Sequence, residues 1–221
     1  MRFVVLLLAW GSGSVSPAFA GAWLQAEGSA FASLENTIRQ RGDDTVLETD
    51  IFFEYGLRPR LSTGLTLLQE GGETGHIGLF LKTPLGQTDK PYVMSLQADI
   101  GGYFARQQWF GMTKLTLSYG RGFRWGDGYG WLNLDTAIEY RMGEPAPFLK
   151  LDGTIGRSSG ARLRPMVEVS LTQTKGKPLI WSVSPNLLID GKGKLTWKLG
   201  LERKNDGQSS NALNFGFWHR F

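Results

Sequence analysis

The sequence predicts an all-β protein, a transmembrane antiparallel up-and-down β-barrel of about 12 strands within a range of 10–14. Three observations support this prediction. Apolar and polar residues alternate along segment after segment, which is the period of a β-strand. No segment has a helical period, so no helix is expected to cover the apolar faces of the strands. Aromatic residues gather where the segments end, as they do at membrane interfaces.

The first 20 residues have the composition of a secretory signal peptide. Arg2 supplies a positive charge, residues 3–10 form an apolar run, and the segment ends in Ala18-Phe19-Ala20. A charged region, an apolar region and a small-residue site in this order are typical of a cleaved leader. A membrane-spanning helix would need ~20 apolar residues, which is more than twice this run. We therefore expect cleavage after Ala20 and a single barrel domain over residues 21–221.

The composition argues against several classes of protein. The 221 residues include no Cys, which excludes disulfides, thiolate metal sites and a lipid attached to a cysteine. The formal charge of +4 comes from scattered Lys and Arg residues and not from a basic run, so we expect no nucleic-acid partner. No residue pattern calls for a cofactor or a metal, and we expect neither.

Twelve segments alternate in this way and are expected to be strands. The first covers residues 23–34. In chain order, the next five and their apolar residues are 45–57 (Leu47, Ile51, Phe53), 60–68 (Leu61, Leu65, Leu67), 76–83 (Ile77, Leu79, Leu81), 92–100 (Met94, Leu96, Ile100) and 112–120 (Leu115, Leu117, Tyr119). The remaining six are 131–141 (Leu132, Leu134, Ile138), 148–155 (Leu149, Leu151, Ile155), 162–172 (Leu163, Val167, Val169), 179–187 (Leu179, Trp181, Val183), 195–203 (Leu195, Trp197, Leu199) and 211–221 (Leu213, Phe215, Phe217). This spacing is typical of hairpins in a barrel or a sandwich.

A membrane barrel explains the pattern better than a soluble sandwich does. A sandwich would cover the apolar faces with a second sheet, whereas a membrane barrel turns them to lipid and can place charges on its inner face. Charges such as Asp50, Asp99 and Lys198 stand in the middle of strands, between uncharged neighbours. Trp and Tyr near the strand ends favour a membrane interface, because their rings prefer the apolar side and their polar groups prefer water.

With its leader, its amphipathic strands and its aromatic last strand, the chain resembles Gram-negative outer-membrane β-barrel proteins. In such proteins the terminal strand is the signal read by the barrel-assembly machinery. Phe215, Phe217 and Phe221 match that signal, while His219 stands where an apolar residue is usual. Residues 21–23 (GAW) and 54–65 (EYGLRPRLSTGL) are also similar to uncharacterised proteobacterial outer-membrane proteins. The resemblance implies export through the periplasm and contact with outer-membrane lipid and lipopolysaccharide.

The same resemblance implies where the turns lie. Both termini would be periplasmic, which requires an even number of strands. The periplasmic turns would be residues 58–60, 84–91, 121–128, 157–161 and 190–194. The extracellular loops would be residues 39–44, 69–75, 102–111, 142–147, 173–178 and 204–211.

The polar faces of the strands are expected to line the lumen. The residues predicted to do so are Glu48, Asp50, Glu54, Lys82, Asp99, Lys114, Asp135, Glu139, Arg141, Lys150, Asp152, Arg162, Arg164, Glu168, Lys198 and Glu202. The two signs of charge are about equally numerous. Eight strands leave an interior just filled by side chains and sixteen leave an aqueous channel, so twelve strands with mixed charges indicate a narrow pore or an interior sealed by ion pairs.

His76 is the candidate catalytic residue. By register it faces the lumen near the outer rim, where a hydrolase acting on lipid would need its base. No Ser or Thr next to it in the sequence suggests a nucleophile, and a catalytic triad needs one within hydrogen-bond reach. Three functions therefore stay open: a narrow, porin-like channel for small polar or charged solutes, a hydrolase of outer-membrane lipid or lipopolysaccharide, and a sealed barrel with a structural or adhesive role.

Overall fold

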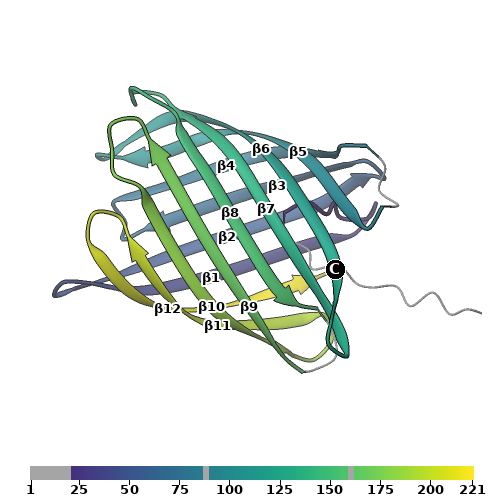
Figure 1. The fold of residues 1–221 in the computed structure, drawn as a ribbon. Helices are drawn as coiled ribbons and strands as arrows, with labels where there is room; N and C mark the ends of the chain where they lie inside the picture. The colour runs from purple at the N-terminus through teal and green to yellow at the C-terminus, as the bar shows by residue number, and fades with distance from the viewer. Residues whose placement is uncertain (1–20, 87–89, 159–161) are drawn as a thin grey trace, which may run out of the picture.

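The computed structural model describes residues 21–86, 90–158 and 162–221. Twelve antiparallel strands form one closed barrel (Figure 1). The strands are β1 (Ala30–Arg41), β2 (Asp44–Arg58), β3 (Leu61–Glu70), β4 (Thr74–Pro84), β5 (Tyr92–Ala105), β6 (Gln108–Trp125), β7 (Gly128–Arg141), β8 (Phe148–Arg157), β9 (Leu163–Thr174), β10 (Ile180–Asp190), β11 (Leu195–Asn205) and β12 (Ser209–Arg220). The predicted fold class and strand number are confirmed. The predicted signal peptide, residues 1–20, lies outside the described residues.

The pairing of β1 with β12 closes the barrel. On one edge of β1, Leu34 lies opposite Ile51 of β2, and on the other edge it lies opposite Phe217 of β12. The end of the barrel at which β1 begins and β12 ends is called here the terminal rim, and the opposite end the far rim. In Figure 1 the terminal rim is on the right and the far rim on the left. The turns between strands alternate between the two rims, as an up-and-down barrel requires.

Most of the turns are shorter than the sequence indicated, because the strands continue into them. The expected loop 102–111 contains the end of β5 and the start of β6, which leaves only Arg106 and Gln107 between the strands. Both residues have positive φ angles, 52° and 62°. A two-residue hairpin with both φ angles positive follows the right-handed twist of its strands. At the terminal rim β6 likewise continues to Trp125, so that the expected turn 121–128 reduces to Gly126 and Asp127.

The first strand begins later than the expected start at residue 23. Residues 21–29 leave the barrel wall and turn into the interior, where Glu27 makes an isolated parallel bridge to Gly56 of β2. The amide of Gly28 donates a hydrogen bond of 2.9 Å to the carbonyl of Gly56, and the amide of Ser29 donates one of 2.9 Å to the carbonyl of Ala26. This turn carries the chain from the interior into β1.

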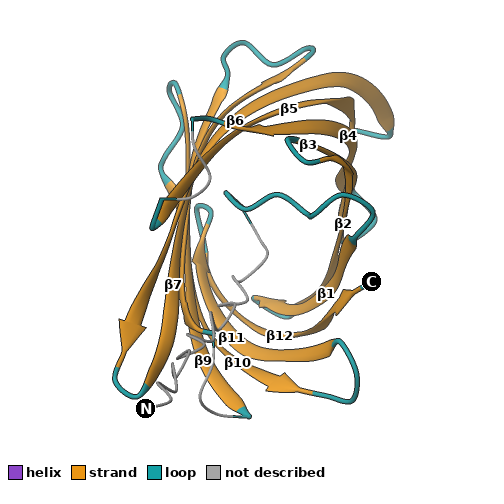
Figure 2. Ribbon diagram, turned by 90° about the vertical axis from the view of Figure 1, so that its right-hand side faces the viewer, coloured by secondary structure: helices purple, strands orange, loops and turns teal. Residues whose placement is uncertain are grey.

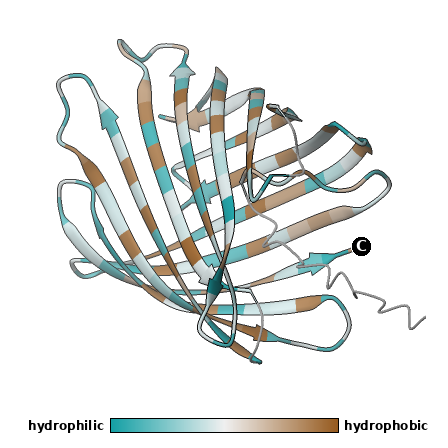
Figure 3. Ribbon diagram, turned by 45° about the vertical axis from the view of Figure 1, so that its right-hand side comes forward, coloured by the Kyte–Doolittle hydropathy of each residue, from teal (hydrophilic) through white to brown (hydrophobic). Residues whose placement is uncertain are grey.

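The outer face of the barrel is apolar. Along each strand the hydropathy alternates (Figure 3), and the large apolar side chains on the outer face are exposed, among them Leu79 at 63 %, Ile100 at 69 % and Leu201 at 62 %. Aliphatic residues exposed in eleven of the twelve strands form a patch far larger than a soluble monomer carries. No helix in the described part of the chain is long and apolar enough to cross a membrane. The exposed residues are those of strands that face lipid.

A charge placed on this outer face tests the lipid contact. Leu117 lies near the middle of β6, whereas Leu47 is near the far-rim end of β2, and both side chains are exposed. We expect Leu117→Arg to lower the free energy of unfolding in lipid vesicles by about 2–4 kcal/mol and Leu47→Arg by about 0–1 kcal/mol, because the cost of a cation rises with depth in the bilayer. Reversible denaturant titration of the refolded protein in vesicles measures both. Equal costs at the two positions would contradict a bilayer centred on the barrel.

Candidate functional site: the barrel interior

The inner face of the barrel carries the charged residues that the strand alternation indicated. Buried side chains are those of Glu48, Glu54, Lys82, Asp99, Glu139, Arg164 and Lys198. Half-buried side chains are those of Lys114, Asp135, Arg141, Lys150, Asp152, Glu168 and Glu202. Asp50 is on the inner face of β2 but exposed. Arg162 is exposed and precedes β9, so it is a residue of the terminal rim.

One wall of the far half is organised by Arg39 of β1. Its side chain is only 1 % exposed, and its guanidinium ion-pairs with Glu48 of β2 at 2.5 Å and with Glu202 of β11 at 2.7 Å. Arg41 extends the network to Asp206 at 2.7 Å. Charge-assisted hydrogen bonds of this kind tie together strands from both sides of the closure. The sequence reasoning missed Arg39 because it ended the first strand at residue 34. Extending the strand and its alternation beyond residue 34 would have placed Arg39 on the inner face.

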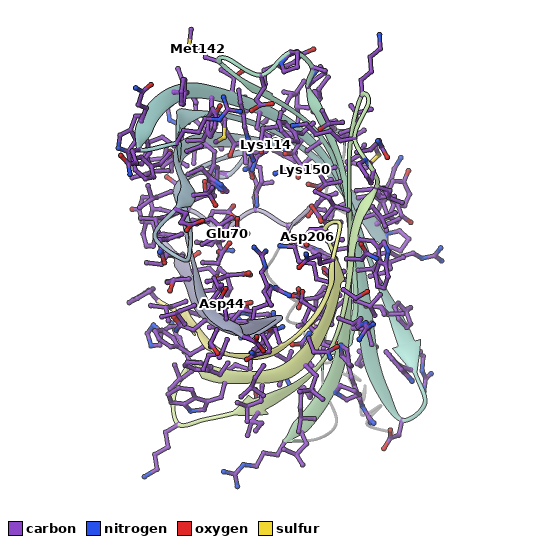
Figure 4. All side chains as sticks on the ribbon, turned by 90° about the vertical axis from the view of Figure 1, so that its left-hand side faces the viewer. Asp44, Glu70, Lys114, Met142, Lys150 and Asp206 are labelled. Atoms are coloured by element: carbon purple, nitrogen blue, oxygen red, sulfur yellow. The ribbon has the colours of Figure 1, made fainter. Side chains whose placement is uncertain are left out.

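The facing wall is basic and is organised by Glu139 of β7. The Glu139 carboxylate accepts hydrogen bonds from Arg141 at 2.6 Å and from Lys150 at 2.8 Å. The guanidinium of Arg141 also lies over the rings of Tyr103, at 5.1 Å, and Phe148, at 4.4 Å, a pair of cation–π contacts. Figure 4, which looks into the far rim, shows Lys114 and Lys150 at the top of the opening, with Glu70 below them on the left and Asp206 below them on the right.

A third group of charges lies deeper in the barrel. The ammonium of Lys198 (β11) ion-pairs with Glu35 of β1 at 2.6 Å and with Glu168 of β9 at 2.7 Å. Asp50 lies within electrostatic reach of these three side chains, and within the described residues no ion pair involves it. Three carboxyl groups therefore accompany one ammonium, and Asp50 is the most exposed of the three. The sequence reasoning missed Glu35 for the same reason as Arg39.

The far half of the interior is open. A cavity of about 620 Å³ lies between the two walls and includes Arg39, Asp50, Arg141, Lys150 and Lys204 in its lining. A second cavity of about 710 Å³ at the far rim is lined by Tyr103, Arg106 and Lys177, among others, and shares Arg141 with the first. We call the two together the vestibule. Its lining mixes both signs of charge with a few aromatic rings.

The terminal half of the interior is packed with apolar side chains. Phe31 of β1, Trp131 of β7, Met166 of β9, Leu188 of β10 and Trp218 of β12 form a buried cluster, each at most 6 % exposed. These strands lie on opposite walls, so the cluster crosses the interior. The rings of Phe52 and Phe80 stack at 5.4 Å and continue the packing from Phe31, which lies 6.1 Å from Phe52. Side chains buried to this degree behave as a protein core and not as the lining of a pore.

Residues 21–29 complete this packing. Figure 2, which looks into the terminal rim, shows the segment crossing the space enclosed by the strands. The amide of Ala22 donates a hydrogen bond of 2.9 Å to the side chain of Asn133 on β7. The ammonium of Lys82 on β4 donates to the carbonyls of Gly21 and Trp23 at 3.0 Å each and to Glu54 of β2 at 2.6 Å. The segment therefore joins two walls of the barrel.

The structure gives His76 no catalytic partner. The residue lies on the inner face of β4, half-buried. Within the residues that the structure describes, no hydroxyl group hydrogen-bonds to its ring, and the charged groups around it are mainly Lys150, Lys114 and Glu139. The described residues also contain no group of three or more His, Asp or Glu side chains that could hold a metal ion.

No protein-family model matches the chain, and no curated protein sequence matches it. Solved structures do. The chain superposes on the KdgM porin with a TM-score of 0.62 at 8 % identity, covering 86 % of this chain and 99 % of the porin. It superposes on the NanC porin with a TM-score of 0.60 at 9 % identity, covering 85 % and 98 %. The β-domain of the Bordetella autotransporter BrkA gives a TM-score of 0.52 at 14 % identity, covering 87 % and 98 %. At these identities the likeness is one of fold, and proteins with different functions share this fold.

The buried pair of Lys82 and Glu54 is expected to carry much of the stability of the terminal half. The two side chains are 1 % and 0 % exposed. We expect Lys82→Met to lower the free energy of unfolding by about 3–5 kcal/mol, because it leaves the carboxylate of Glu54 buried without a cation. The double variant Lys82→Met/Glu54→Leu should recover a large part of that loss. Denaturant titration in vesicles or detergent measures both.

Lys177 provides the matched control for this measurement. It pairs with Glu144 at the far rim, and its side chain is 55 % exposed. Lys177→Met should change the free energy of unfolding by less than about 1 kcal/mol, because water solvates both partners once the pair is broken. If Lys82→Met lowered the free energy of unfolding by as little as Lys177→Met, water would have to reach Glu54, and the terminal half would not be packed.

Proposed function

We propose that this chain is an outer-membrane barrel that conducts small polar or charged solutes through a narrow, porin-like pore. The observation that carries the proposal is the vestibule, a charged cavity with open volume inside a barrel whose outer face is apolar. The wall around Glu139 carries two cations, Arg141 and Lys150, for one carboxylate, and this excess of positive charge on one wall would set up a transverse field that orients polar solutes. The fold shared with the KdgM and NanC porins agrees with this function. One of the KdgM structures is described as a complex with disordered oligogalacturonate.

The proposal includes a location and partners. The chain would be exported by its leader and inserted with the terminal rim in the periplasm and the far rim outside. Its outer face would contact outer-membrane lipid and lipopolysaccharide. Phe215, Phe217 and Phe221 at the end of the chain would present the last strand to the barrel-assembly machinery. Residues 21–23 and 54–65 support a kinship with uncharacterised proteobacterial outer-membrane proteins. The sixteen charged side chains named from the sequence, apart from Arg162, would line the interior.

A sealed barrel is the second candidate, and the packed terminal half favours it. If the apolar cluster around Trp131 and residues 21–29 never move, the vestibule is a blind cavity. The far rim would then serve for structural or adhesive contacts. The hydrolase hypothesis is not proposed, since His76 has no hydroxyl partner among the described residues.

Single-channel recording decides between the two candidates. The full chain, expressed with its leader and purified from the outer-membrane fraction, is expected to give discrete and reproducible conductance steps in a planar bilayer. The mass of the purified protein reports in the same experiment whether cleavage follows Ala20. Heat-dependent migration in gels shows whether the purified protein is folded. The absence of conductance steps from folded protein would favour the sealed barrel.

The ion selectivity of the pore should depend on Asp50. This carboxylate is exposed to the interior beside Glu35, Glu168 and Lys198. We expect Asp50→Asn to lower the cation-to-anion permeability ratio at pH 8 by up to about fivefold, because a unit charge a few ångström from the ion path is worth roughly 1 kcal/mol in water. Reversal potentials in a salt gradient measure the ratio. Asp43→Asn, in the exposed turn between β1 and β2, is the matched control and should leave it unchanged. An unchanged ratio in Asp50→Asn would remove Asp50 from the ion path.

A further inference from the structure

Residues 21–29 occupy the interior at the point where an open lumen would have to continue from the vestibule to the terminal rim. The side chain of Ala22 is 1 % exposed and that of Gln25 is 4 % exposed. The amide of Gln25 lies 3.4 Å from the carboxylate of Glu54, on the wall formed by β2. Residues 26–28 are exposed where the segment turns towards β1. A segment that merely hung from the rim would not bury Ala22 and Gln25 to this degree.

The barrel wall is shaped to receive this segment. A Cβ atom on Gly56 of β2 would lie 2.1 Å from the carbonyl oxygen of Ala26, and one on Gly120 of β6 would lie 2.7 Å from the ring of Trp23. At Gly56 the close atom belongs to the backbone, so only glycine leaves room there. At Gly120 the close atoms belong to side chains of the segment, so a larger residue there would require the Trp23 ring to shift. The two glycines stand on different walls, and the segment fits against both. Trp23 in turn packs on the buried cluster of Phe31, Trp131, Met166, Leu188 and Trp218.

The segment can leave without dismantling the barrel. It is joined to the wall by a few hydrogen bonds, among them those to Asn133 and Lys82, and by the bridge of Glu27 to Gly56. All pairings between the twelve strands are independent of it. Lys82 would keep its ion pair with Glu54, so no buried charge would be left alone. The expected cleavage after Ala20 would make residue 21 a free chain end, which a segment needs if it is to withdraw.

We propose that residues 21–29 are a built-in plug that closes the pore between the vestibule and the terminal rim, and that solutes pass only while the plug is displaced. The proposal rests on the proposed function, because a plug has a role only in a barrel that conducts. The closed pore is the resting state. Openings are brief and begin with loss of the contacts that Ala22 and Trp23 make.

A disulfide staple tests the plug directly. The chain contains no cysteine, so the double variant Ala22→Cys/Gly120→Cys carries the only two thiols. A Cβ on Gly120 would lie 2.9 Å from the Cβ of Ala22, and a shift of less than about 1 Å gives the spacing of roughly 3.5–4.5 Å that a disulfide requires. In planar bilayers we expect the mean current of the oxidised variant to be at least tenfold lower than that of the reduced variant, and reduction should restore it. The two single-cysteine variants are the controls, and their mean current should be the same under oxidising and reducing conditions.

A second variant weakens the plug in place of locking it. Asn133→Ala removes the side chain that accepts the hydrogen bond from the Ala22 amide and should raise the fraction of time that the pore is open several-fold. Asn36→Ala is the matched control, because Asn36 stands on the outer side of β1, where it accepts a hydrogen bond from Thr49. Asn133→Ala keeps the plug testable if the disulfide of the double-cysteine variant does not form.

The outcomes separate the plug from the pore. Equal currents from the oxidised and reduced staple, with the disulfide verified by mass, would overturn the plug and leave the channel standing. An unchanged open fraction in Asn133→Ala would count against the plug in the same way. If the reduced staple, Asn133→Ala and the unmodified protein are all folded and all silent, the proposed channel function fails and the plug fails with it.

Discussion

The closure of the hydrogen-bonded ladder between β1 and β12 is the constraint on which the rest of the structure depends. In a bilayer no water satisfies a free amide or carbonyl, so every strand needs a partner on both edges. The pairing of Leu34 with Phe217 on one edge and Ile51 on the other meets this need for β1. Once the sheet is closed, the pleat sends alternate residues to lipid and to the interior. The apolar outer face and the charged inner face are two consequences of the same pairing.

A second constraint is that the barrel interior confines many charged side chains, which have limited access to bulk water. Ionised groups out of bulk water need partners and hydrogen bonds. Arg39 joins β1 to β2 and β11, Glu139 joins β7 to β8, and Lys198 joins β11 to β1 and β9. These networks stiffen the far half while leaving the vestibule open. The terminal half is built differently, with a core of Phe, Trp, Met and Leu side chains and an inserted chain segment.

Much of this could be predicted from the sequence, because a strand has a strict period of two. The same alternation that predicts Leu117 on the outer face predicts Lys82, Glu54 and Glu139 on the inner faces of their own strands. The structure buries all three of these charged side chains. Arg39 and Glu35 were missed because the first strand was placed too early, at residue 23, and cut short at 34. The turn between β5 and β6 was overestimated in length, since Arg106 and Gln107 are not the Gly or Asn residues that usually mark a turn with positive φ.

The sequence by itself determined the barrel, its strand number and the two faces of each strand, since these follow from local alternation and from the need to cover apolar surface. Only the tertiary structure decided which charges meet, that Asp50 stands without an ion pair in the described chain, and that residues 21–29 fill the lumen. The physical reason is that such contacts join residues far apart in the chain. Ala22 and Asn133 are 111 residues apart, and only the closed barrel brings them together.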